Sequence, residues 1–213
     1  MPARKRLAIF GAAENAELAG YYFLRDRPDL ELKCFVTDTG ADSLLMGLPV
    51  IPEASFISEY DSADCGVFAP YVDGRDRQHK QHQLEALGYN FETYVSPHAL
   101  VWDLAAVGKN CFVQEFNNIQ FGTVIGDGCT FWAGNHIGHH GTIKPYATFT
   151  SHVTLSGRCH VGSGTYFGVN ATIRDGLTIG DDIFVGQGSN VTRNLEQAGV
   201  YVGSPASRLR DWR

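Results

Sequence analysis

The chain has 213 residues and a net charge of −6, a length that allows one or two domains. The acidic balance argues against a nucleic-acid-binding protein, which needs a concentrated basic face. The sequence shows no signal-peptide pattern and no apolar run long enough to span a membrane, and its five cysteines form no CxxC pair. We therefore expect a reduced, cytoplasmic protein.

The first 97 residues alternate short apolar runs with polar helical segments. Strands are expected at residues 7–10, 31–36, 49–51 and 65–69, and helices at residues 14–25 and 75–87. Such alternation predicts a small, Rossmann-like parallel α/β sheet. The segment that follows, residues 89–95, leads into Ser96 and Pro97 and ends this domain.

Two residues of the first domain are candidates for binding a substrate. Ligands of parallel sheets lie beyond the carboxyl ends of the strands, which places them near Gly11 and Asp38. Asp38 suits a ribose hydroxyl or a base edge, although a solvated loop carboxylate is an equal alternative. Only the first glycine of a GxGxxG pattern is present, and Glu14 carries negative charge where a diphosphate would rest. A dinucleotide is therefore disfavoured, and a nucleotide-linked sugar stays open.

The second domain, residues 98–213, contains sixteen uninterrupted hexapeptides that each begin with an apolar residue. Their first residues are Val101, Val107, Val113, Ile119, Ile125, Phe131, Ile137, Ile143, Phe149, Leu155, Val161, Phe167, Ile173, Ile179, Val185 and Val191. The fifth position is mostly small or apolar, and the fourth favours Gly, Asn or Asp, which tolerate positive φ. This repeat predicts a three-sided parallel β-helix with the first and fifth side chains inward.

Three hexapeptides close one coil of eighteen residues, and successive coils are expected ~4.8 Å apart. Phe131, Phe149 and Phe167 are spaced eighteen apart, so their rings should stack along one corner. Cys111 and Cys129 share the same spacing at inward positions and are expected to be buried thiols. The open strand edges at both ends need capping, which the segments before Val101 and after Glu196 should provide.

On these features the chain resembles the NeuD/PglD group of bacterial sugar acyltransferases. The resemblance rests on Ile9-Phe10-Gly11, Val36-Thr37-Asp38, the hexapeptide repeat, Gly138-His139-His140, Leu155-Ser156-Gly157, Phe167-Gly168-Val169-Asn170-Ala171 and Tyr201-Val202-Gly203-Ser204-Pro205-Ala206. It covers nearly the whole chain. It implies a left-handed β-helix, a homotrimer, and transfer of an acetyl or similar short acyl group from acetyl-coenzyme A, without a metal. The acceptor would be an amino group of a nucleotide-linked sugar, in surface polysaccharide or glycan biosynthesis.

The resemblance also implies roles for individual residues. His139 matches the catalytic base, and the N–H of Gly157 matches the donor to the thioester oxygen. Gly168, Gly186, Gly203 and Pro205 are expected beside coenzyme A, with Gly157. Two positions depart from the group: His140 stands where an acidic residue usually orients the base, and Thr148 replaces a second histidine.

The histidines allow more than one interpretation. His139 and Gly157 are eighteen residues apart, so they should lie one above the other on adjacent coils, as acyl transfer requires of a base and an oxyanion donor. His136 is the next candidate base, and His140 is expected to orient a neighbour or the substrate. A zinc site is the rival interpretation, because zinc carbonic anhydrases use the same prism, although their five-residue histidine spacing is missing here.

Two further functions remain open from the sequence. One is O-acetylation of a sugar such as sialic acid, because amines and hydroxyls attack the same carbonyl carbon. The other is a non-catalytic trimeric β-helix that serves as a binding module.

Overall fold

The computed structural model describes residues 5–40 and 43–212 and divides the chain into two compact units, Met1–Tyr94 and Val95–Arg213. The domain boundary expected from the sequence lies between residues 97 and 98. Among the described residues, no helix combines the length and the apolar character that crossing a bilayer requires.

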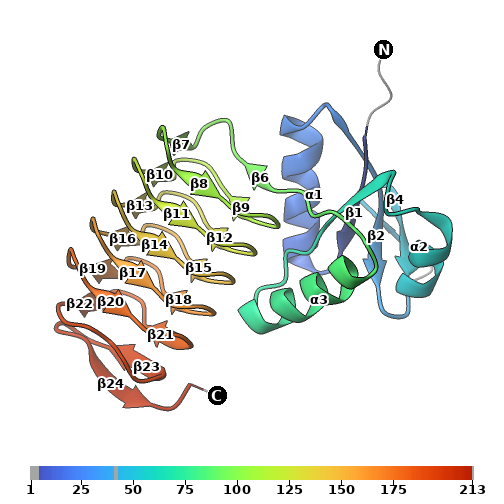
Figure 1. Ribbon diagram of the computed structural model, residues 1–213. Coiled ribbons are helices and arrows are strands. Elements are labelled where there is room, and N and C mark those ends of the chain that lie inside the picture. Colours follow the sequence, from blue (N-terminus) through green and yellow to red (C-terminus); the bar gives the residue numbers. More distant parts are fainter. Residues whose placement is uncertain (1–4, 41–42, 213) are drawn as a thin grey trace. The chain divides into compact units, whose positions relative to one another are not determined.

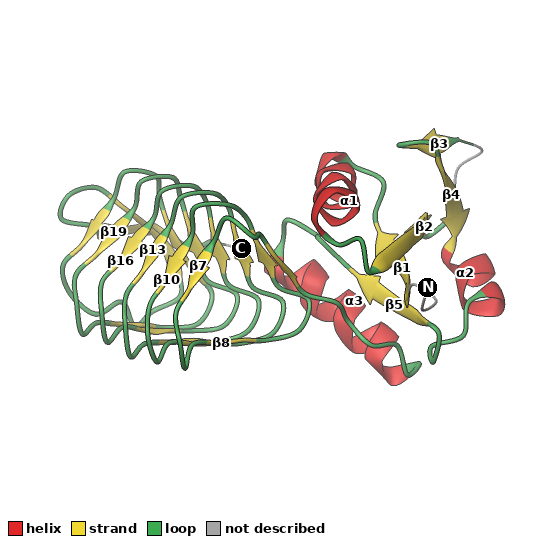
Figure 2. Cartoon of the chain, turned by 90° about the horizontal axis from the view of Figure 1, so that it is seen from above, coloured by secondary structure: helices red, strands yellow, loops and turns green. Residues whose placement is uncertain are grey.

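Unit 1 is a five-stranded sheet with three helices (Figures 1 and 2). The strands are β1 (Lys5–Phe10), β2 (Leu30–Thr37), β3 (Leu44–Leu45), β4 (Leu48–Pro52) and β5 (Cys65–Phe68), in the order β3-β4-β2-β1-β5. The helices are α1 (Glu14–Asp26), α2 (Glu53–Glu59) and α3 (Gly74–Ala86). Four strands run parallel, which confirms the predicted Rossmann-like sheet, whereas β3 pairs antiparallel with β4 at the edge.

Helices cover both faces of this sheet. On the face covered by α1, the ring of Phe23 in α1 lies 5.0 Å from the ring of Phe68 in β5, centroid to centroid. On the other face, Phe10 of β1 meets Phe56 of α2 at 5.3 Å, and Leu84 of α3 joins the same cluster. Apolar side chains thus leave the sheet in both directions, which is typical of parallel strands that are buried on two sides.

Unit 2 is a stack of short coils in which three rows of strands form three parallel sheets (Figures 1 and 2). One row holds β7 (Leu100–Val101), β10 (Asn118–Ile119), β13 (His136–Ile137), β16 (Thr154–Leu155), β19 (Thr172–Ile173) and β22 (Asn190–Val191). The second holds β8 (Ala106–Val107), β11 (Val124–Ile125), β14 (Thr142–Ile143), β17 (His160–Val161) and β20 (Thr178–Ile179). The third holds β6 (Tyr94–Val95), β9 (Phe112–Val113), β12 (Thr130–Phe131), β15 (Thr148–Phe149), β18 (Tyr166–Phe167), β21 (Ile183–Val185), β23 (Gly199–Val202) and β24 (Ser207–Arg210).

The register of these sheets confirms the eighteen-residue coil. Strands of adjacent coils pair at a separation of eighteen residues, as Ile119 pairs with Ile137 and Ile137 with Leu155. The last coil is shorter, because β21 pairs with β23 at a separation of sixteen, Ile183 with Gly199. The fourth residue of every hexapeptide from Leu104 to Gly188 has a positive φ. The corners demand this conformation even of His140 at φ 55°, a residue type that tolerates it better than most.

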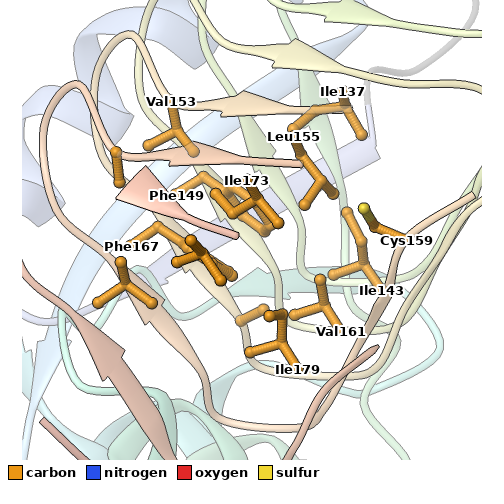
Figure 3. Packing of buried hydrophobic residues seen from close by; sticks show 14 of the residues in the cluster. Ile137, Ile143, Phe149, Val153, Leu155, Cys159, Val161, Phe167, Ile173 and Ile179 are labelled. Carbon is orange, nitrogen blue, oxygen red and sulfur yellow. The ribbon is translucent and has the colours of Figure 1, made fainter. Parts of the chain in front are cut away.

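The interior of the prism is the apolar core of unit 2. Figure 3 shows side chains of successive coils, among them Ile137 and Leu155, pointing into the prism. The column of Phe131, Phe149 and Phe167 stacks with centroids 4.8 and 4.6 Å apart, as predicted. Together these features confirm the predicted fold class, a left-handed parallel β-helix joined to an α/β domain.

Polar residues at inward positions find partners inside the prism. Asn135 Nδ2 donates to Asn117 Oδ1 at 2.9 Å, and its own Oδ1 accepts from the Val153 N–H at 2.8 Å. Cys111 and Cys129 are fully buried, as predicted, and burial raises the pKa of the Cys111 thiol well above its usual range. At the C-terminal end β24 turns back antiparallel to β23, which interrupts the parallel stacking and caps the sheet.

Candidate active site

One corner of the prism brings together His139, His140 and Gly157. His139 occupies the third position of its hexad and is half-buried. A methyl group built on Gly157 would lie 2.8 Å from both Cε1 and Nε2 of the imidazole. The ring therefore lies directly against the Gly157 backbone on the next coil, as the spacing predicts. Gly157 adopts no left-handed conformation, so only the imidazole requires a glycine here.

His139 and His140 form a hydrogen-bonded imidazole pair. Their Nδ1 atoms are 3.0 Å apart, and the rings meet edge to face. Two neutral imidazoles can make this bond only if one carries its proton on Nδ1 and the other accepts there. If His139 is the donor, its Nε2 carries the free lone pair and faces Gly157. His140 thus lies where it can orient a neighbour, which is one of the two roles expected for it.

Aromatic side chains from the two preceding coils line a pocket beside the histidine pair. The pocket has a volume of about 380 Å³ and is lined by Trp102, Gln120, Phe121, His139 and His140. The Phe121 ring lies 5.5 Å from the His140 ring, and Trp102 Nε1 donates to Asn118 Oδ1 at 3.0 Å. Trp102, Gln120 and Phe121 were not predicted as site residues from the sequence. The coil period was the available signal, because Phe121 lies eighteen residues before His139.

The Gly157 N–H is free to bind an anionic oxygen. At two equivalent corners a carboxylate of the next coil accepts a hydrogen bond from the backbone N–H at the same hexapeptide position. The Lys109 N–H donates to Asp127 Oδ1 at 2.8 Å, and the Ser163 N–H donates to Asp181 Oδ1 at 2.7 Å. The Gly157 N–H makes no hydrogen bond to an acceptor in residues 5–40 and 43–212. An imidazole and an N–H that has no acceptor among the described residues therefore share one corner.

The other predicted site residues lie elsewhere. His136 on β13 is half-buried, like His139, but it does not line the pocket of His139. Gly168 and Gly186 are needed for packing: a methyl group on Gly168 would lie 2.5 Å from the Gln187 nitrogen, and one on Gly186 would lie 2.8 Å from a Val202 methyl. This packing accounts for both glycines without coenzyme A, whose contacts with them stay a prediction.

Gly203 and Pro205 form the turn between β23 and β24. Gly203 has φ +100°, a conformation that favours glycine, and the peptide bond before Pro205 is cis. Their contact with coenzyme A also stays a prediction.

Unit 1 holds a second, polar pocket of about 340 Å³, lined by Asp38, Glu53, Tyr71, Asp76, His79, Lys80 and Gln83. Lys80 Nζ donates to Glu53 Oε2 at 2.6 Å and lies 3.8 Å from Asp38 Oδ1. Burial, followed by the nearby carboxylates of Asp38 and Glu53, raises the pKa of Tyr71 to about 12. This phenol therefore stays protonated and can donate a hydrogen bond.

Of the two residues predicted in unit 1, only Asp38 lines this pocket. The Gly11 N–H donates to the Val36 carbonyl at 2.7 Å, and Gly11 adopts φ +120° at the end of β1. Glu53 and Lys80 were missed because α2 was not predicted and α3 was treated only as a polar helix.

No group of three or more histidine, cysteine or carboxylate side chains in the described part of the chain is arranged to hold a metal ion. The prediction that the reaction uses no metal is left open by this finding.

Comparison with known proteins supports the fold over nearly the whole chain. The acetyltransferase domain of PglB from Neisseria gonorrhoeae superposes with a TM-score of 0.89 at 21% identity, covering 97% of this chain and 100% of that one. Perosamine N-acetyltransferase from Caulobacter crescentus superposes with a TM-score of 0.90 at 22% identity, over 98% and 99%. That structure is a histidine-to-asparagine variant in complex with CoA and GDP-perosamine. WeeI from Acinetobacter baumannii gives 0.89 at 23% identity, over 95% and 99%.

Sequence relatives match only part of the chain. A putative acetyltransferase of Staphylococcus aureus is 36% identical over 55 residues, which is 26% of this chain and 28% of that protein. The UDP-3-O-acylglucosamine N-acyltransferase of Herminiimonas arsenicoxydans is 31% identical over 91 residues, or 42% of this chain and 26% of that enzyme. The match thus spans about a quarter of the length of these curated relatives. The chain matches no protein-family model.

Proposed function

We propose that the protein is an acyltransferase that moves an acetyl or short acyl group from coenzyme A to an amino group of a nucleotide-linked sugar. The observation that carries the proposal is the corner where the His139 imidazole lies against Gly157, whose N–H has no acceptor among the described residues. The superposable acetyltransferase domain of PglB and the superposable perosamine N-acetyltransferase, the latter with CoA and GDP-perosamine bound, support the same assignment.

The proposed reaction begins with proton removal at His139. His140 accepts the Nδ1–H of His139, which fixes the tautomer with the lone pair on Nε2. As the sugar amine attacks the thioester carbonyl carbon, Nε2 takes the proton of the amine. Such general-base assistance contributes roughly 10²–10⁴-fold to rate.

The carbonyl oxygen becomes an oxyanion when the amine adds. The Gly157 N–H would stabilise it, on the scale of about 2.7–4 kcal/mol for one such donor. The C–S bond then breaks, the coenzyme A thiolate takes the proton held by His139, and the sugar carries the new amide. The amine, the thioester and the imidazole thus account for every proton.

The acceptor is proposed to bind with its nucleotide in the polar pocket of unit 1. Asp38 offers carboxylate oxygens to ribose or base donors, and the protonated Tyr71 offers a donor. The pocket contains three carboxylates, from Asp38, Glu53 and Asp76, and one lysine, Lys80. The excess of negative charge suits hydrogen-bond donors of the base or sugar better than it suits a diphosphate.

We further propose a homotrimer in which the pocket of His139 lies at a subunit interface. Two large apolar side chains that line this pocket are exposed, Trp102 at 49% and Phe121 at 41%. Exposed apolar surface of this kind marks interaction sites. A solution mass three times that of the chain is expected.

The experiment that tests the function is a panel of UDP-, GDP- and dTDP-linked amino sugars with acetyl-coenzyme A, followed by mass spectrometry. We expect an acetylated product with at least one acceptor. Coenzyme A should also raise the melting temperature, because a ligand at 100 times its Kd stabilises the folded state by about 2.7 kcal/mol. Free sialic acid serves as the hydroxyl acceptor for O-acetylation. No product and no thermal shift at millimolar coenzyme A would favour a non-catalytic binding module.

Gly157→Ala is expected to lower kcat at least about tenfold with little change in melting temperature. The new methyl group would lie 2.8 Å from the imidazole and displace it, but the backbone conformation suits alanine. The control is the same change in a His139→Ala background, where the ring is gone and no further loss in kcat is expected. Additive losses in the two backgrounds would show that Gly157 acts independently of the ring.

A further inference from the structure

At a corner of this prism the N–H of the third hexapeptide residue can bind an anionic group, and at two corners a carboxylate of the chain occupies it. Asp127 caps Lys109 and Asp181 caps Ser163, in both cases from eighteen residues further on. Asp175 holds the equivalent place above Gly157, yet its Oδ2 accepts from Arg158 Nη2 at 3.0 Å.

Three corners of the repeat have an aspartate eighteen residues further on, and the residue before the N–H differs between the two closed ones and the corner of Gly157. Gly108 precedes Lys109, and Gly162 precedes Ser163. A methyl group on Gly108 would lie 2.3 Å from Asp127 Oδ1, and one on Gly162 would lie 2.5 Å from Asp181 Oδ1 and 2.3 Å from the backbone of Gly180. The capping carboxylate therefore occupies the space that a side chain at this position would take.

Ser156 precedes Gly157 and carries a Cβ at this position. We propose that Ser156 keeps the oxyanion donor open, because its Cβ excludes the carboxylate of Asp175 from the Gly157 N–H. Ser156 is thus a positioning residue, and its effect requires the carbon atom rather than the hydroxyl. Arg158 holds the excluded carboxylate as an exposed ion pair. Such pairs contribute little to stability, so the Cβ is the decisive element.

This inference rests on the proposed role of the Gly157 N–H and leads to one set of variants. Ser156→Gly is expected to let Asp175 cap the N–H and to lower kcat at least tenfold, towards the ~10²–10³-fold loss typical of a removed oxyanion donor. Ser156→Ala keeps the Cβ and should retain the wild-type kcat. Adding Asp175→Ala to Ser156→Gly removes the cap and should restore kcat.

A crystal structure of Ser156→Gly separates the two levels of the argument. We expect an Asp175 carboxylate oxygen within about 2.7–3.2 Å of the Gly157 nitrogen. Asp175 still bound to Arg158 would overturn the inference and leave the proposed function standing. A capped N–H with unchanged kcat would overturn the role of Gly157 as donor. An equal loss of kcat in Ser156→Ala would assign the effect to the hydroxyl and also overturn the inference.

Discussion

Replacing His139 by alanine is expected to lower kcat by at least about 10²-fold with acetyl-coenzyme A and the preferred amino sugar. The three atoms nearest to a methyl group built on Gly157 all belong to this imidazole, and His140 is the other histidine that lines the pocket. Because His139 is half-buried at an outer corner, its loss leaves the core intact. The measurement is steady-state kinetics beside a thermal melt of the same preparation.

Two histidine variants serve as controls for this prediction. His136→Ala removes a half-buried ring that does not line the pocket and should leave kcat near the wild-type value. His140→Ala should lower kcat less than His139→Ala, since it removes only the acceptor that fixes the tautomer. A loss confined to His136→Ala would move the base three residues back and contradict the proposed mechanism.

Replacing Ile137 by aspartate is expected to abolish the cooperative unfolding of the β-helix. Ile137 is fully buried in the prism, between Ile119 and Leu155 of the adjacent coils. The change forfeits about 1.5–3 kcal/mol of apolar burial and places a carboxylate where no solvent reaches it, at a cost of several kcal/mol. Together these approach the 5–15 kcal/mol by which a typical domain is stable. Circular dichroism melts measure the effect.

Thr154→Asp is the matched control for this second prediction. Thr154 precedes Leu155 on the adjacent strand, and its side chain is exposed. A surface change of this kind usually alters stability by less than about 0.5 kcal/mol. If Ile137→Asp melted like Thr154→Asp, the first hexad position would not face inward.

The architecture of unit 2 could be predicted because one short period governs it. An apolar residue every six positions sets the strands, and eighteen residues set the register, so Phe131 had to meet Phe149. In unit 1 the longer elements were predicted to within one or two residues. The elements α2 and β3 were missed, because seven and two residues are too few to show a helical or strand period.

The candidate site was predictable where it follows the coil and not elsewhere. His139 and Gly157 were paired because their separation equals one coil. Trp102 and Phe121 lie on the same edge of the prism, but ordinary surface aromatics give the same pattern in a sequence. Glu53 and Lys80 meet across 27 residues through an ion pair that no repeat indicates.

A crystal structure of the protein with coenzyme A tests the central claim most directly. The account predicts that the thiol lies at the corner of the prism where the imidazole of His139 meets the backbone of Gly157, within reach of both groups. Coenzyme A bound with its thiol at a different corner, or a crystal soaked at millimolar concentration that holds none, would contradict the account.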